Sequence, residues 1–145
     1  MILLAPGFAV PLRAAQTNKP NVVFILVDDM GYADTSCYQT FVTPVVITTN
    51  VDHLATQGIR FTQYHSSSPI CSPSRTGLLT GSYPGRWRIT SFINNKAANR
   101  QRNMADFADP RVPTIARAFK TAGYKVGHFG KWHMGAGRNI DDAPL

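Results

Sequence analysis

The sequence has few cysteines, few acidic residues and no long apolar run. Its 145 residues include two cysteines, Cys37 and Cys71, so at most one disulfide can form. The apolar run at residues 1–12 is too short to cross a bilayer, and no other segment is a candidate, so we expect no membrane span. We find no low-complexity tract and no internal repeat, which excludes repeat architectures.

The shortage of acidic residues leaves the chain strongly basic. Eight Asp and Glu residues stand against 15 Lys and Arg residues, which gives a formal net charge of +7. Much of the positive charge lies in one stretch, at Arg86, Arg88, Lys96, Arg100, Arg102 and Arg111. This stretch is either a solvated basic surface or a surface that attracts a polyanion, which would be a nucleic acid or a sulfated polymer. No nucleic-acid-binding motif accompanies it, so we expect no nucleic-acid partner.

The remaining composition is that of one globular domain. Hydrophobic residues make up 43% of the chain and charged residues 16%. We assign residues 19–145 to the domain and residues 1–18 to a signal-peptide remnant or a disordered lead. Ala14 and Ala15 follow the apolar segment as they do near a secretory cleavage point, although no basic residues precede it. We therefore expect an exported protein, either periplasmic or extracellular.

Cys71 stands immediately before an expected helix. Ser72 is a good N-cap residue, and Pro73 then falls at the first helical position. The start of a helix favours a nearby anion, and Arg75 adds a cation one turn into the helix. Cys71 is therefore either a packed thiol, a disulfide partner of Cys37, or a reactive group beside an anionic substrate.

A pair of carboxylates follows an apolar run near the N-terminus. Residues 21–27 are mostly β-branched or aromatic, which is typical of a strand buried in a parallel sheet, and Asp28 and Asp29 come directly after them. Ligands bind at the carboxyl ends of such strands, and paired carboxylates suit Ca²⁺ or Mg²⁺ better than zinc. The alternative is one helix-capping residue beside one solvated acid.

The last third of the chain predicts a helix followed by a strand. Pro113 opens the helix, Gly123 marks its end, and residues 124–129 have the pattern of a strand. A right-handed crossover would place this strand parallel to the first. Lys131 and His133 would then lie at the sheet edge where the first strand ends. In isolation, these two residues favour the alternative, in which Lys131 is a surface charge and His133 a packed imidazole.

Three further segments lie between these candidates. We expect a helix over residues 50–58, capped by Asn50 and ended by Gly58, and a half-buried strand over residues 59–64. The helix that follows Cys71 should end at Gly81. Residues 94–109 are polar, so we expect them to be exposed, either as a rim that contacts substrate or as an ordinary loop.

Two of these segments together resemble the signatures of the type I sulfatases. Cys71-x-Pro73-x-Arg75, continued through residues 76–84, is similar to the sequence in which the family oxidises a cysteine to formylglycine, an aldehyde. Residues 130–135 read Gly-Lys-Trp-His-x-Gly, which resembles a second signature of the family. The resemblance covers about residues 19–138. It implies an α/β, alkaline-phosphatase-like fold: a mostly parallel sheet flanked by helices, here incomplete.

The resemblance also implies roles for individual residues. The catalytic set would be Cys71, Arg75, Lys131 and His133, and the ligands of a Ca²⁺ or Mg²⁺ ion would be Asp28, Asp29 and the formylglycine made from Cys71. One hydroxyl of the formylglycine hydrate would attack sulfur, and loss of a proton from the second would expel sulfate and restore the aldehyde. The substrate would be a sulfated small molecule or a sulfated polysaccharide, and a formylglycine-generating enzyme would be a partner.

The resemblance concerns only the N-terminal part of a sulfatase domain. Family members are several times longer, and their later part supplies further metal ligands, another histidine and another lysine. We therefore expect a truncated chain with little or no activity of its own. Two alternatives remain: a phosphatase or phosphodiesterase of the alkaline-phosphatase-like group, which generally lacks Cys-x-Pro-x-Arg, and a non-catalytic basic module that binds polyanions.

Overall fold

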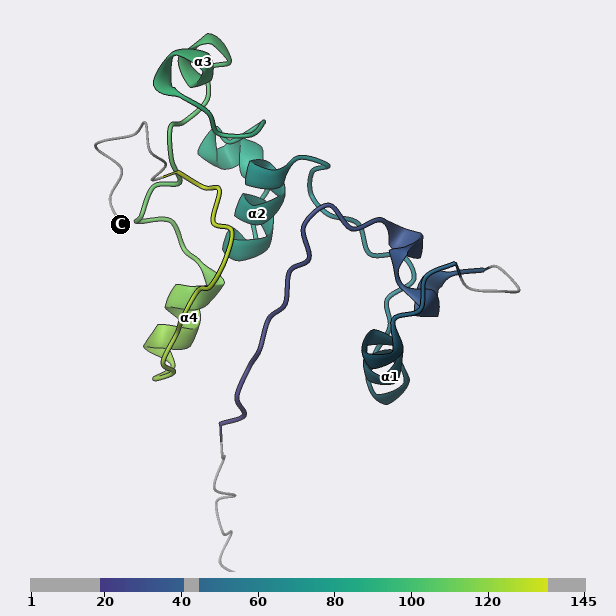
Figure 1. The fold of residues 1–145 in the computed structure, drawn as a ribbon. Coiled ribbons are helices and arrows are strands. Elements are labelled where there is room, and N and C mark those ends of the chain that lie inside the picture. The colour runs from purple at the N-terminus through teal and green to yellow at the C-terminus, as the bar shows by residue number, and fades with distance from the viewer. Residues whose placement is uncertain (1–18, 41–44, 136–145) are drawn as a thin grey trace, which may run out of the picture.

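The structure is a computed structural model that describes residues 19–40 and 45–135. Within these ranges it contains helices and no β-strand. In chain order the helices are η1 (Tyr32–Asp34), η2 (Ser36–Tyr38), α1 (Thr49–Gln57), α2 (Cys71–Thr80), η3 (Pro84–Trp87), α3 (Lys96–Gln101) and α4 (Ile115–Thr121), where η denotes a 3₁₀ helix (Figure 1). None of those helices is long and apolar enough to cross a membrane. The expected leader at residues 1–18 lies outside the described residues.

The helices form two groups (Figure 1). Helix α2 packs against η3 and α4 in one group, while α1 packs against η2 in the other. The first group contains the hydrophobic core, in which Ile89, Ile93 and Met104 are buried. Trp87 and Phe107 pack against these three side chains. The core therefore lies beside α2, the helix that begins with Cys71.

Residues 94–109 differ from the exposed loop that the sequence predicted. They contain α3, and Asn99 within it is completely buried. The Asn99 amide donates to the Asn94 carbonyl at 2.8 Å and to Asp106 Oδ1 at 2.9 Å, and its oxygen accepts from the Asn94 N–H at 2.9 Å. Because these bonds satisfy the amide, a polar residue can lie beneath the surface here and hold the segment against the core.

Helix α2 begins two residues earlier than predicted. Ile70, with extended backbone, is the N-cap residue, and Cys71 is the first helical residue. Ser72 does not cap the helix, because its hydroxyl accepts a hydrogen bond from the Ile93 N–H at 2.9 Å instead. Pro73 is the third helical residue, where an N–H group would have no partner within the helix in any case.

Two predicted helix ends are confirmed, and the predicted start of α1 is wrong. Gly81 adopts the left-handed conformation after α2 (φ 62°), and Gly123 does so shortly after α4 (φ 84°), as the sequence predicted. Asn50 is not the cap of α1: Thr48 is the N-cap residue. The Thr48 hydroxyl donates to Asp52 Oδ1 at 3.1 Å, and the N-cap of α1 lies two residues earlier than predicted.

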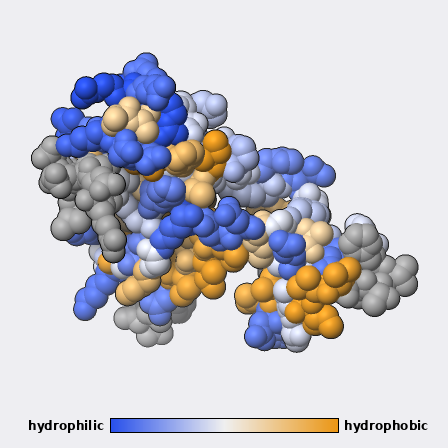
Figure 2. Space-filling model, turned by 45° about the horizontal axis from the view of Figure 1, so that its top comes forward, coloured by the Kyte–Doolittle hydropathy of each residue, from blue (hydrophilic) through white to orange (hydrophobic). Residues whose placement is uncertain are grey.

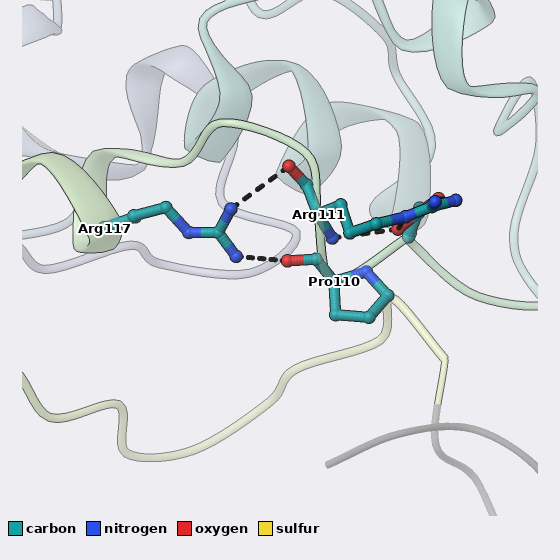
Figure 3. Close-up of polar contacts among 4 residues, drawn as sticks. Pro110, Arg111 and Arg117 are labelled. Atoms are coloured by element: carbon teal, nitrogen blue, oxygen red, sulfur yellow. Dashed lines mark hydrogen bonds and ion pairs between the residues drawn. The ribbon is translucent and has the colours of Figure 1, made fainter.

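Helix α4 is fixed at its start by two contacts. The Thr114 side chain accepts a hydrogen bond from the Arg117 N–H at 3.2 Å, which caps the helix. The Arg117 guanidinium donates to the carbonyl oxygens of Pro110 and Arg111, the latter at 3.1 Å (Figure 3). These bonds hold the preceding turn against the helix.

The three segments predicted as strands have no strand pairing within the described residues. Residues 21–27 run as an extended trace (Figure 1), and the side chains at 22–27 are 44–83% exposed. Ile59 and Phe129 are also exposed, Phe129 to 94%. A strand needs a neighbour for its backbone hydrogen bonds, and the described part of the chain offers none. Apolar residues therefore gather on the surface, as Figure 2 shows in orange.

Candidate active site at the start of helix α2

Side chains from three distant segments meet at the start of α2. Cys71 is the first residue of the helix, Asp28 and Asp29 follow the extended N-terminal segment, and Lys131 belongs to the Gly-Lys-Trp-His segment. One ligand atom from each of Asp28, Asp29 and Cys71 lies within 4.8 Å of the other two. The Lys131 ammonium lies 3.5 Å from Cys71 Sγ. The structure thus brings these four residues together, although the described part of the chain contains no sheet edge to hold them.

The side chain of Arg75 links the segment that carries Asp28 to the segment that carries Lys131. Its side chain is buried, with the residue 7% exposed. One Nη donates to Asp28 Oδ1 at 2.9 Å, and the other donates to the Lys131 carbonyl at 2.6 Å. Its Nε is buried and has no hydrogen-bond partner among the described residues. Arg75 therefore fixes the backbone that carries Lys131 and retains one free donor.

Lys131 and Asp28 form an ion pair that keeps both side chains charged. The Lys131 ammonium donates a hydrogen bond to Asp28 Oδ2. This bond, and then the bond from Arg75, lower the pKa of Asp28 below its usual 3.8. The same bond to Asp28 raises the pKa of Lys131 above its usual 10.5. Both groups are therefore charged at neutral pH.

The turn that presents Lys131 and His133 has an unusual backbone. The φ angle is positive at Gly130 (97°), His133 (53°) and Gly135 (108°). Glycine adopts such angles without steric cost. At Gly135 a Cβ atom would also lie 2.1 Å from the Cβ of Phe107. The glycine spacing of this segment is thus the sequence signal for a turn that lies against the core.

The contacts of His133 differ from those of the other predicted catalytic residues. Its Nε2 lies 3.3 Å from the Ile93 carbonyl oxygen. Its Nδ1 is buried and has no hydrogen-bond partner among the described residues. Within the described part of the chain, His133 forms no hydrogen bond with Cys71 or Asp28. The structure therefore places it against the loop before α3.

The disulfide alternative for Cys71 is wrong, because Cys37 and Cys71 are both free thiols. Cys37 lies in η2, where its Sγ is 3.7 Å from the Thr35 hydroxyl oxygen. Cys71 is half-buried beside a lysine and two carboxylates. The two cysteines thus occupy chemically different surroundings.

Two residues beside this site, Ser72 and Ile93, were not predicted from the sequence. Ser72 resembled a capping residue, and its completely buried position inside the first turn could not be distinguished from a cap by pattern alone. Ile93 contributes backbone atoms only, its N–H to Ser72 and its carbonyl to His133. Backbone contacts leave no residue-type signal in a sequence.

Comparison with known proteins identifies the family. A family model described as Sulfatase matches residues 20–143. The chain belongs to the sulfatase family. It is 40% identical over 121 residues to the N-acetylgalactosamine-6-O-sulfatase of Bacteroides thetaiotaomicron, covering 83% of this chain and 22% of that sulfatase. Human arylsulfatase A is 34% identical over 137 residues, which cover 94% of this chain and 24% of that enzyme.

A solved structure shows the same fold. It comes from a study of how Bacteroides thetaiotaomicron metabolises multiple glycosaminoglycans, and it matches with a TM-score of 0.65 and 39% identity. The match covers 81% of this chain and 22% of that sulfatase-type chain. The present chain therefore spans about a fifth of the length of these relatives. Its described residues have the sulfatase fold, represented here by helices.

Proposed function

We propose that this chain carries the nucleophile and part of the cation site of a sulfuric ester hydrolase that acts through formylglycine made from Cys71. The observation that supports the proposal is the convergence at the start of α2. There, the donor atoms of Asp28, Asp29 and Cys71 lie within 4.8 Å of one another, and Lys131 lies 3.5 Å from the Cys71 sulfur. A hydrated aldehyde supplies a hydroxyl nucleophile and a second hydroxyl through which the product can be released.

The donor set fits a hard cation when residue 71 carries oxygen. Ca²⁺ and Mg²⁺ take oxygen ligands, which the carboxylates of Asp28 and Asp29 provide. A thiolate suits softer metals, so the conversion of Cys71 to formylglycine would change a poor ligand into a good one. A bound cation would lower the pKa of a hydroxyl at residue 71.

The cationic side chains would act on the sulfate group. Sulfate ester oxygens are anionic and repel a nucleophile, so the site must neutralise them. The Lys131 ammonium, 3.5 Å from Cys71 Sγ, is available for this, and the buried Arg75 guanidinium adds positive charge beneath it. A divalent cation held by Asp28 would compensate that carboxylate and leave the Lys131 ammonium to bind substrate. The Nδ1 of His133 would accept the proton of a formylglycine hydroxyl.

We further propose that polypeptide beyond this chain completes the site. Ca²⁺ takes six to eight ligands, whereas the described residues contain a single cluster of three donor groups. The exposed extended segments at 21–27 and 124–129 would find strand partners in the same additional polypeptide, which would complete a mostly parallel, alkaline-phosphatase-like sheet. Residues 19–145 would form the N-terminal part of that domain. The 145-residue chain alone would then have little or no activity.

The substrate class we propose is a sulfated sugar, a sulfated polysaccharide or an aryl sulfate. The relative from Bacteroides thetaiotaomicron is named an N-acetylgalactosamine-6-O-sulfatase. Arg86, Arg88, Arg100 and Arg111 are exposed, so they would attract an anionic polymer toward the protein. We also propose export from the cytoplasm and modification by a formylglycine-generating enzyme.

A chimeric enzyme tests this function. Residues 20–135 would replace the matching part of the Bacteroides thetaiotaomicron sulfatase, and the chimera would be produced together with a formylglycine-generating enzyme. We expect it to hydrolyse an aryl sulfate ester, and we expect Cys71→Ala to abolish that activity while the chimera stays folded. A chimera that hydrolysed the matched aryl phosphate and not the sulfate would contradict the proposal.

A further inference from the structure

The side chain of Ser72 is completely buried although it belongs to the first turn of α2. Its Oγ accepts a hydrogen bond from the Ile93 N–H at 2.9 Å, across 21 residues of sequence. A helix N-terminus has unpaired N–H groups that a serine hydroxyl can satisfy locally. Ser72 instead uses its oxygen to hold a remote backbone segment directly beside the reactive cysteine.

The same remote residue contacts His133 through its other backbone group. The Ile93 carbonyl oxygen lies 3.3 Å from His133 Nε2. The Ile93 side chain is 8% exposed and packs with Ile89 and Met104 in the core. Because that packing holds residue 93 in place, its two backbone bonds connect α2 to the histidine through a rigid link.

This link determines which nitrogen of His133 carries the proton. A carbonyl oxygen can only accept a hydrogen bond, so Nε2 must be the donor. In the neutral imidazole the lone pair then lies on Nδ1, the nitrogen that is buried without a partner among the described residues. His133 also has a left-handed backbone (φ 53°), which a non-glycine residue keeps only when its surroundings hold it there.

We propose that Ser72 is a positioning residue that acts through the Ile93 backbone to hold His133 as the Nε2–H tautomer, with the lone pair on Nδ1. Ser72 touches no substrate in this account. Its hydroxyl fixes the Ile93 segment, the Ile93 carbonyl fixes the imidazole, and Nδ1 remains as the proton acceptor. The catalytic meaning of this link rests on the proposed function, but the tautomer and its dependence on Ser72 do not.

The experiment is NMR spectroscopy of the full 145-residue chain labelled with ¹⁵N, under mildly alkaline conditions. We expect the two ring nitrogens of His133 to resonate far apart, in the pattern of a single Nε2–H tautomer. In Ser72→Ala the Ile93 N–H loses its acceptor. Its hydrogen exchange should then accelerate about tenfold or more, and the His133 resonances should move toward the average of two tautomers.

Two further variants separate positioning from a general loss of structure. Ser72→Thr keeps the hydroxyl and should retain the Nε2–H pattern. Ser74→Ala makes the same chemical change on the same helix, at a side chain that has no hydrogen bond with the described residues, and should leave His133 unchanged. Averaged resonances in the unsubstituted chain, or a His133 pattern that Ser72→Ala does not alter, would overturn the proposal.

This result is independent of sulfatase activity. If the chimera fails to hydrolyse sulfate esters but Ser72→Ala still releases the His133 tautomer, the proposed function fails and the link stands. If the chimera is active and the tautomer does not respond to Ser72, the link is wrong and the proposed function stands.

Discussion

The start of α2 and the extended segments differ in burial and in hydrogen-bond partners. At α2, Arg75 is buried and its two Nη groups have found partners in segments 47 and 56 residues away. In residues 22–27 the side chains are 44–83% exposed and the backbone pairs with no strand in the described ranges. Polar contacts between single residues thus form within this chain, whereas a sheet needs several neighbouring strands.

The first test breaks the turn that holds Lys131 and His133. Gly135→Ala should destabilise the chain by about 3 kcal/mol, because a Cβ atom would meet Phe107 and the left-handed backbone disfavours alanine. The control is Gly130→Ala, where φ is also positive (97°) but no atom of the described residues, apart from the adjoining ones, lies within 4 Å of the new Cβ. Its cost should be about 1–2 kcal/mol. Urea unfolding measures both, and equal costs would contradict the proposed packing of Gly135 on the core.

The second test removes the buried guanidinium. Arg75→Met should lower the free energy of unfolding by about 2 kcal/mol, because it removes the donor to the Lys131 carbonyl from a buried position. Arg86 is the matched control: it is exposed, and its Cζ lies over the Trp87 ring, 5.6 Å from the ring centroid. We expect Arg86→Met to cost less than about 1 kcal/mol. The two values come from the same denaturation series, and a loss no larger at Arg75 than at Arg86 would count against the account.

The third test uses pH to break the ion pair between Lys131 and Asp28. The pKa of Asp28 is lowered, so its contribution to stability is present above about pH 4 and is lost as the pH falls through the folded-state pKa. The pKa of Lys131 is raised, so its contribution is present below about pH 10 and is lost as the pH rises through the folded-state value.

The stability difference between the unsubstituted chain and Lys131→Met should therefore be constant from about pH 5 to pH 9 and shrink on both sides. Urea midpoints across the pH range measure it. A difference that persists undiminished at the acid end would mean that Asp28 is not the partner of Lys131.

The fourth test concerns the extended segments and should give the smallest effect. Phe129 is 94% exposed, so Phe129→Ser should change the stability of this chain by less than about 0.5 kcal/mol. It should also reduce self-association, because exposed apolar patches promote it. Unfolding and sedimentation measure these two effects. A large destabilisation would show that the segment is packed within this chain after all.

The site was more predictable from sequence than the fold. Cys71, Arg75, Asp28 and Lys131 lie in short motifs whose glycine, proline and charge spacing determine the local backbone, and the structure brings them together. The helix ends at Gly81 and Gly123 were predictable for the same reason.

The other features of the fold and the site depend on contacts between distant segments, which the pattern of residues does not reveal. Residues 21–27 have the composition of a buried strand, but a strand forms only beside another, and none lies in the described part of the chain. Residues 94–109 are polar in composition, yet the satisfied amide of Asn99 lets them lie against the core. The contacts of His133 depend on the Ile93 carbonyl, which no side-chain pattern encodes.

The most direct test of the central claim is the mass of the peptide that carries Cys71, after production of the chain together with a formylglycine-generating enzyme. The account predicts conversion of Cys71 to the aldehyde, which is lighter than the thiol, and a large loss of conversion in Arg75→Ala. An unmodified thiol at Cys71, in cells that contain an active formylglycine-generating enzyme, would contradict the claim that this segment is a working sulfatase signature.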